Sequence, residues 1–147
     1  MTSVNSGDSS PLTHVRSDGS SHMVDVSGKA VTTREAVASA TLTSRADVID
    51  RVLAGELPKG EALSVARVAG IMAAKRTHEL IPLCHPLPIT KVTVDFARIA
   101  PEVIEVRARV KTEGKTGVEM EALTAASVAA LTVLSLIHIS EPTRLLS

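Results

Sequence analysis

Apolar and polar residues alternate in three segments of the chain, and alternation is the pattern of a half-buried strand. Residues 89–99 and 103–110 alternate clearly, and the link Ala100–Glu102 is short enough for an antiparallel hairpin. Residues 34–43 also alternate, with small side chains on one face. Thr32 and Glu35 would instead suit a helical capping box, but the alternation favours a strand.

Helical spacing of apolar residues predicts three helices. Ser44 followed by Asp47 is an N-cap signature, and the helix it opens runs to Gly55. A second helix, about Glu61–His78, is apolar over more than half its circumference, which predicts deep burial of Leu63, Val65, Ala66, Val68, Ala69, Ile71 and Met72. Residues 119–133 predict a third helix of small residues. Helices and strands mix without β-α-β regularity, so the predicted class is α+β, an antiparallel sheet backed by helices.

The 147 residues suit one domain with a polar leader. Residues 1–21 are rich in Ser, Thr, Gly and Asp, and we expect them to be disordered. Structure is expected to begin at HMVDVS, residues 22–27. We therefore assign residues 22–133 to the folded domain and treat residues 134–147 separately.

Composition narrows the classes of partner. Sixteen basic residues balance sixteen acidic ones, and the only aromatic residue is Phe96, so neither a global field nor base stacking favours nucleic acid. The single cysteine, Cys84, and the absence of a signal peptide favour the cytoplasm. Residues 122–139 lack charge and approach the length of a membrane span, but their alanine and threonine contribute little to insertion. We expect no membrane association.

Two familiar motifs begin in this sequence without being completed. GKTG, residues 114–117, would need a glycine five places earlier to be a phosphate-binding P-loop, and Arg109 stands there. Lys115 and the amides before Glu119 could still hold one anion, the alternative being a solvated lysine at a strand end. His78-Glu79 lacks the second histidine of a zinc protease. His78, Cys84 and His85 as metal ligands would lack a regularly spaced fourth.

The proline-rich segment IPLCHPLP, residues 81–88, is the strongest candidate for a site. Its prolines predict a stiff, extended loop that fixes Cys84 and His85. Adjacent residues on an extended chain point apart, so we assign a contact role to Cys84 and the chemistry to His85, with a structural His85 as the alternative. Glu119 and Glu121 lie about 200° apart on a helix, so at most one faces a given pocket; both could instead serve only the helix dipole.

Taken together, six fragments resemble one family, in order: HMVDVS (22–27), TREA (33–36), PKG (58–60), ARVAGIMAAKRT (66–77), LIPLCHPL (80–87) and GKTGVEMEALTAASVAALT (114–132). They are similar to the MoaC family, the cyclic pyranopterin monophosphate synthases of molybdenum cofactor biosynthesis, from about residue 13 to 133. The resemblance implies a ferredoxin-like α+β fold and a homohexamer built from dimers, with active sites at subunit interfaces. It implies a lyase that converts (8S)-3′,8-cyclo-7,8-dihydroguanosine 5′-triphosphate into cyclic pyranopterin monophosphate and releases diphosphate.

The resemblance also implies roles for individual residues. Lys59, which alone reads as an ordinary loop lysine, matches the catalytic lysine, and His85 is assigned to proton transfer. Substrate contacts are implied for Leu83, Cys84, His85, Met120 and Glu121, with Glu119 beside them, Arg34 as a phosphate ligand and Lys115 as a weaker candidate. No resident cofactor is implied, and Mg²⁺ is considered only as a companion of the triphosphate. The competing interpretation is a catalytically inactive homologue that binds nucleotide or assembles with active subunits.

The resemblance stops after Val133. Family members continue with a Tyr-Asp-Met-Cys-Lys-Ala-like stretch whose Asp and Lys belong to the active site, whereas this chain has Ser135 and His138 there. LSLIHISEPTR, residues 134–144, resembles the translation of a sequencing adapter. We therefore predict that residues 134–147 are an artefactual tail on a C-terminally truncated domain, and that the chain as printed is inactive, poorly soluble or both.

Overall fold

The computed structural model describes residues 30–58 and 61–140, so the predicted leader (1–21) and the HMVDVS segment (22–27) lie outside the described residues. Its elements, in chain order, are β1 (Thr32–Thr43), α1 (Ala46–Ala54), α2 (Ala62–Lys75), α3 (Thr77–Leu80), β2 (Ile89–Ala100), β3 (Val103–Gly114) and α4 (Glu119–Ser140).

The three strands form one antiparallel sheet in the order β1-β3-β2, which confirms all three predicted strands. β2 and β3 make the expected hairpin, and β1 pairs with the other edge of β3 from Thr32↔Gly114 to Thr43↔Val103. The fold is therefore α+β, with an arrangement consistent with the ferredoxin-like class.

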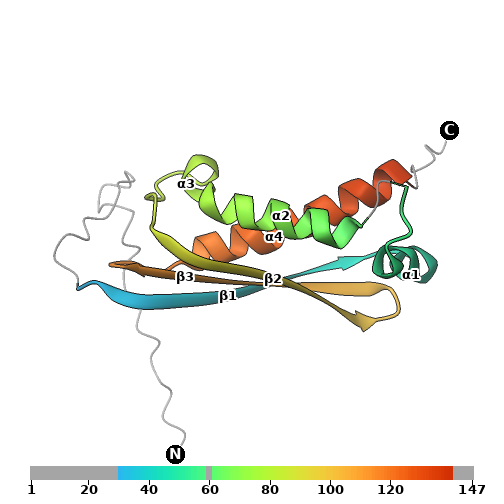
Figure 1. Ribbon diagram of the computed structural model, residues 1–147, viewed down its shortest axis with the longest axis horizontal. Coiled ribbons are helices and arrows are strands. Elements are labelled where there is room, and N and C mark those ends of the chain that lie inside the picture. The colour runs from blue at the N-terminus through green and yellow to red at the C-terminus, as the bar shows by residue number, and fades with distance from the viewer. Residues whose placement is uncertain (1–29, 59–60, 141–147) are drawn as a thin grey trace, which may run out of the picture.

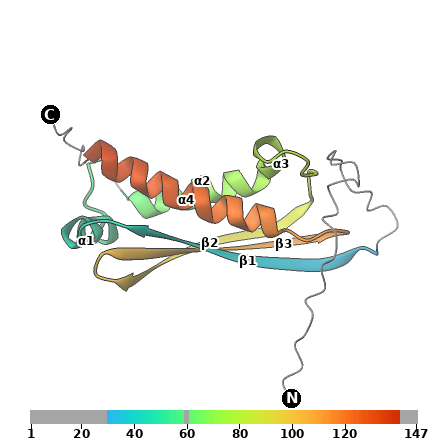
Figure 2. The same cartoon turned by 180° about the vertical axis from the view of Figure 1, so that it is seen from behind.

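Helices α2 and α4 lie side by side on one face of the sheet (Figures 1 and 2). The covered face presents the buried alternate residues of β3, which are Ile104, Val106, Ala108, Val110 and Thr112. No described helix covers the other face, and charged side chains occupy it. There Glu35 of β1 forms ion pairs with Arg109 and Lys111 of β3.

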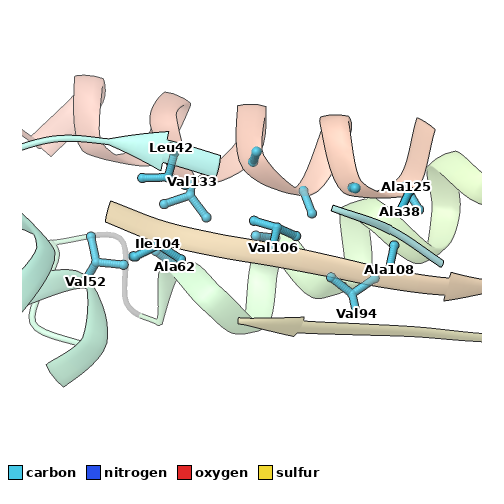
Figure 3. Close-up of a cluster of buried hydrophobic side chains, with 14 of the residues drawn as sticks. Ala38, Leu42, Val52, Ala62, Val94, Ile104, Val106, Ala108, Ala125 and Val133 are labelled. Atoms are coloured by element: carbon cyan, nitrogen blue, oxygen red, sulfur yellow. The ribbon is translucent and has the colours of Figure 1, made fainter. Parts of the chain in front are cut away.

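The core between helices and sheet consists of small aliphatic residues (Figure 3). Its tightest point is Gly70 on α2. A Cβ atom there would lie 3.0 Å from the carbonyl oxygen of Ala125 and 3.2 Å from Val94 Cγ2. The glycine therefore allows α2 to approach α4 and β2 closely.

The first helix departs from its prediction at the N-terminal end and matches it at the C-terminal end. Ser44 is not the N-cap of α1, because the cap position is Arg45, which forms no side-chain capping hydrogen bond. At the other end the prediction holds: Gly55 ends the helix in the left-handed conformation (φ 70°), which glycine adopts without steric strain.

The predicted second helix, 61–78, is wrong in its length and in its burial. It ends at Lys75, and α3 begins at Thr77, whose hydroxyl donates to the carbonyls of Ala73 and Ala74. Such hydroxyl bonds to the carbonyls of the preceding turn slightly destabilise a helix and often bend it. The buried stripe of α2 is Ala62, Ala66, Gly70, Ala73 and Ala74, whereas three larger predicted core residues, Val65, Val68 and Met72, are exposed.

Helix α4 continues seven residues beyond the predicted end at Val133. Its residues 119–139 are long and apolar enough to cross a membrane by length and composition. One stripe of this helix, which includes Ala122, Ala126, Ala129 and Val133, is buried against the rest of the chain. In this fold α4 therefore serves as the core helix of a globular domain.

Candidate functional site

The loop between α3 and β2 carries Cys84 and His85, both half-buried. The prolines predicted an extended loop, but this loop is not extended throughout its length. The amide of Cys84 donates to the carbonyl of Ile81 (3.4 Å), which closes a turn over Pro82 and Leu83. Leu83 has φ 67°, in the left-handed region, and residues 84–88 then run without regular secondary structure into β2.

Thr112 of β3 fixes the far end of this loop to the sheet. Its hydroxyl donates to the carbonyl of Pro88 (2.7 Å), although the side chain is fully buried among apolar residues. Thr112 also pairs with Ile89 of β2 and with Arg34 of β1. The pairing puts Arg34 on the helix-covered face, in the same row of the sheet as the end of the loop.

Arg34 is half-buried at the beginning of β1, and its Nε donates to the carbonyl of Gly114 (3.3 Å). Gly114 begins the GKTG segment that connects β3 to α4, and Lys115 is half-buried beside it. The structure thus brings Arg34 next to the segment that carries Lys115. The spacing of these two cations in the sequence does not predict that they lie in adjoining segments.

The first turn of α4 presents Glu119, Met120 and Glu121. Glu119 and Met120 are exposed, whereas Glu121 is only 5% exposed, so the two carboxylates face different surroundings as their helical spacing predicts. Burial raises the pKa of Glu121 above its usual range, and the nearby Glu119 charge acts in the same direction. The imidazole of His78 partly opposes this increase.

Cys84 and Glu121 interact electrostatically, although 37 positions separate them in the chain. Burial raises the pKa of the Cys84 thiol, and the Glu121 charge raises it further. A thiol in these surroundings stays protonated at neutral pH, which disfavours a thiolate nucleophile. The contact role that the sequence predicts for Cys84 does not require a thiolate.

His78 belongs to this group, which the sequence analysis did not recognise. It lies on α3, which packs against α4, and its Nε2 is 3.8 Å from Oε1 of Glu79. The sequence offered it only as a metal ligand. Within residues 30–58 and 61–140, no group of three or more His, Cys, Asp or Glu side chains is arranged to hold a metal ion.

The predicted site residues that the structure describes lie at one end of the molecule. α3 and the beginning of α4 share one end of the sheet, whereas α1, the beginning of α2 and the C-terminal end of α4 share the other (Figures 1 and 2). Lys59 lies outside the described residues.

Comparison with known proteins identifies the family. The sequence model of the MoaC family matches residues 23–144, which is most of the chain. The chain belongs to the MoaC family. The match includes residues 134–144, part of the segment for which we predict an artefactual origin.

Named relatives of this MoaC-family chain are similar over most of their length. A cyclic pyranopterin monophosphate synthase of Corynebacterium efficiens is 62% identical over 128 residues, which is 87% of this chain and 82% of that protein. Proteins of the same name from Corynebacterium glutamicum and from a Jannaschia species are 59% and 56% identical, over 81% and 82% of their own lengths.

Proposed function

We propose that this MoaC-family chain is a lyase of molybdenum cofactor biosynthesis. It converts (8S)-3′,8-cyclo-7,8-dihydroguanosine 5′-triphosphate into cyclic pyranopterin monophosphate and releases diphosphate. The observation that carries this proposal is the shared name of relatives that are 56–62% identical over more than four fifths of their length. The alternative of an inactive homologue gains no comparable support.

The chemistry of the substrate explains the proposed residue roles. Its triphosphate needs cations, for which we propose Arg34 and, more weakly, Lys115. These two residues belong to adjoining segments, because Arg34 hydrogen-bonds the carbonyl of Gly114. Ring opening and ring closure require proton transfer, which we assign to His85 and Lys59. Closing the cyclic phosphate expels diphosphate, and nearby cations stabilise its developing charge.

The buried acidic group has a different role. The charge of Glu121 acts on the thiol of Cys84, and burial raises the pKa of both groups. We assign them, with Leu83 and Met120, to contacts with the base and sugar of the substrate. Glu119 is exposed beside them. We propose no resident cofactor, with Mg²⁺ only as a companion of the triphosphate.

The active site is proposed to form between copies of the chain. Arg34, Cys84, His85 and Glu121 belong to the α3 end of the sheet, whereas α1 and the beginning of α2 lie at the opposite end. The family's Asp and Lys positions, 135 and 138, also lie toward that opposite end, on the last turns of α4. One copy therefore supplies one half of the site and a second copy supplies the other.

An exposed apolar surface supports association. Ser64, Val65, Val68, Ala69 and Met72 of α2 line an almost wholly apolar hollow of about 450 Å³. Val68 is 57% exposed, which is unfavourable in water unless another chain covers it. We propose a homo-oligomer, a homohexamer built from dimers as in the resembling family, working in the cytoplasm.

Turnover by site variants tests the function. We expect Lys59→Ala and His85→Ala each to lower turnover of the cyclised dihydro-GTP by at least about a hundredfold, the usual effect of losing an acid–base group. Cys84→Ser should have a milder effect, because no thiolate step is proposed. The variants are compared in a chain whose residues 134–139 are replaced by the family's Tyr-Asp-Met-Cys-Lys-Ala stretch. Near-wild-type turnover by both alanine variants would show that the site assignment is wrong.

A further inference from the structure

Thr112 is a polar residue in an otherwise aliphatic row of the sheet. The other β3 residues on the helix-covered face are aliphatic, and Thr112 is fully buried like them. Valine has nearly the same shape and would fill the position without a hydroxyl. A buried hydroxyl is unfavourable unless it finds a partner, so the hydrogen bond of Thr112 decides whether the residue is tolerated there.

The partner of this hydroxyl is the last residue of the loop that carries His85. Thr112 Oγ1 donates to the carbonyl oxygen of Pro88 at 2.7 Å, and His85 lies three positions before Pro88. The short segment between them contains Pro86, and each proline has a restricted φ. A fixed carbonyl at Pro88 therefore limits where the backbone of His85 can lie.

The chain leaves the regular strand ladder at Pro88. The amide of Ile89 donates to the carbonyl of Leu87 (3.0 Å), which closes a γ-turn around Pro88. The register of β2 against β3 then shifts between Ile89 and Lys91, where β2 has one extra residue, a β-bulge. The turn and the bulge set the direction in which the loop leaves the sheet, and the Thr112 hydroxyl holds the carbonyl between them.

We propose that Thr112 is a positioning residue for the reaction, because its buried hydroxyl holds the end of the loop so that the imidazole of His85 stays where it can transfer a proton. The inference rests on the proposed function, in which His85 is a proton-transfer group. Proton transfer requires the two groups to lie within hydrogen-bond reach, so a small displacement of the loop lowers the rate of the chemical step more than it weakens substrate binding.

The kinetics of Thr112→Val and Thr112→Ser test the positioning, in the chain that carries the family's Tyr-Asp-Met-Cys-Lys-Ala stretch at positions 134–139. Valine removes the hydroxyl and should lower kcat for the cyclised dihydro-GTP about tenfold, with little change in KM. Serine keeps the hydroxyl and should restore most of kcat, although it loses a buried methyl group and should melt below the parent chain. A parental kcat in Thr112→Val, or a kcat of Thr112→Ser as low as that of the valine variant, would overturn the proposal.

A double-mutant cycle with His85→Ala separates positioning from a general structural effect. Adding Thr112→Val to His85→Ala should lower turnover little further, because the hydroxyl acts through His85. A further tenfold loss would show that Thr112 acts independently, contrary to the proposal.

Thr77→Val is the matched control. Thr77 is equally buried, but its hydroxyl donates to the carbonyls of Ala73 and Ala74 on α2 and not to the loop. This variant should leave kcat unchanged. If it lowers kcat as much as Thr112→Val does, the loss of any buried hydroxyl explains the effect and the positioning role is wrong.

Hydrogen exchange of the loop amides tests the contact without turnover. In the full chain, the amides of residues 83–89 should exchange about tenfold faster in Thr112→Val than in the parent, in Thr112→Ser or in Thr77→Val. Unchanged exchange in Thr112→Val would overturn the proposal whatever the kinetics show. If the exchange rates differ as expected but the parent chain has no turnover, the proposed function fails together with the catalytic use of Thr112, and only the anchoring of the loop stands.

Discussion

At the scale of single residues, the buried carboxylate of Glu121 links stability to pH. Burial raises its pKa, so the folded chain favours the protonated form more than the unfolded chain does. The stability contribution is therefore fully present below the unfolded pKa, about 4.3, and is lost as pH rises through the folded value. At neutral pH burying Glu121 therefore lowers stability, because the carboxyl must either be ionised in a buried position or take up a proton on folding.

Replacing Glu121 by glutamine should therefore raise the melting temperature at neutral pH. We expect an increase of about 2–4 °C, the shift that about 1 kcal/mol produces in a chain of this size. The difference should shrink as the pH is lowered toward 4, because Glu121 then becomes neutral as well. Glu119→Gln is the control, since Glu119 is exposed. A stabilisation by Glu121→Gln that is equal at pH 4 and pH 7 would contradict a carboxylate origin.

Sequence predicted individual site residues where local chain stiffness marked them. The prolines around Cys84 and His85 identified the loop, and helical spacing separated Glu119 from Glu121. The turn at Leu83 could not be predicted, because a positive φ is recognisable in sequence only when glycine or asparagine occupies the position. The hydrogen bond from Thr112 to Pro88 joins residues 24 positions apart, and such a contact leaves no local pattern.

At the scale of elements, the contact of α2 with α4 depends on Gly70. A valine there would direct its branched Cβ into the Ala125 carbonyl and the Val94 side chain, at 3.0 and 3.2 Å. Overpacking of this kind costs about 1–3 kcal/mol, which exceeds the few tenths of a kcal/mol of helix propensity that valine gains over glycine. Gly70→Val should therefore unfold at a lower denaturant midpoint than the parent chain.

The control for Gly70→Val is Lys75→Ala, at the exposed C-terminal end of α2 and outside the apolar hollow. This change should shift the midpoint little, because no core contact is lost. Gly70→Val with an unchanged midpoint would show that α2 and α4 separate easily, contrary to the close approach described for the fold.

The strands could be predicted from sequence more fully than the helices. Alternation over 89–99 and 103–110 specifies one buried face, and the sheet has one. α2 carries apolar residues on more than half its circumference, but in a single chain only its small-residue stripe is covered. The pattern predicted burial correctly only for the side that faces the same chain, since apolar spacing alone does not specify which side of a helix is covered.

At the scale of the whole molecule, the exposed face of α2 should be the contact between copies. Val68→Glu introduces a charge into the apolar hollow that Val65 and Met72 also line. In sedimentation velocity at about 10 μM we expect the parent chain to be oligomeric and the variant to shift toward monomer, with unchanged helical circular dichroism. Val37→Glu, on the open face of the sheet, should leave assembly intact. If Val37→Glu dissociates the oligomer and Val68→Glu does not, the contact lies on the open face of the sheet and the prediction for α2 is wrong.

The last prediction concerns residues 134–147, whose sequence departs from the family pattern. The structure continues α4 through Ser140, and Ser135 and His138 are exposed on its last turns. They lie one helical turn apart, at the end of the molecule where α2 begins. That is the end from which one copy is proposed to complete the site of another. Position and spacing therefore suit two functional side chains, but serine cannot act as a carboxylate base and histidine does not replace a permanently charged amine.

We therefore expect the chain as printed to form no cyclic pyranopterin monophosphate, and the version with Tyr-Asp-Met-Cys-Lys-Ala at positions 134–139 to form it. The control carries the same replacements but keeps Ser135. It restores the rest of the family stretch without the carboxylate and should stay inactive. Sequencing the gene past the codon for Val133 tests the origin of the tail directly. Genomic DNA that encodes residues 134–147 as printed would refute the artefact, and product formation by the printed chain would refute the need for the aspartate and lysine. The two outcomes are independent. A chain with a naturally encoded tail can be inactive, and a chain with an artefactual tail can still turn over substrate with its remaining site residues.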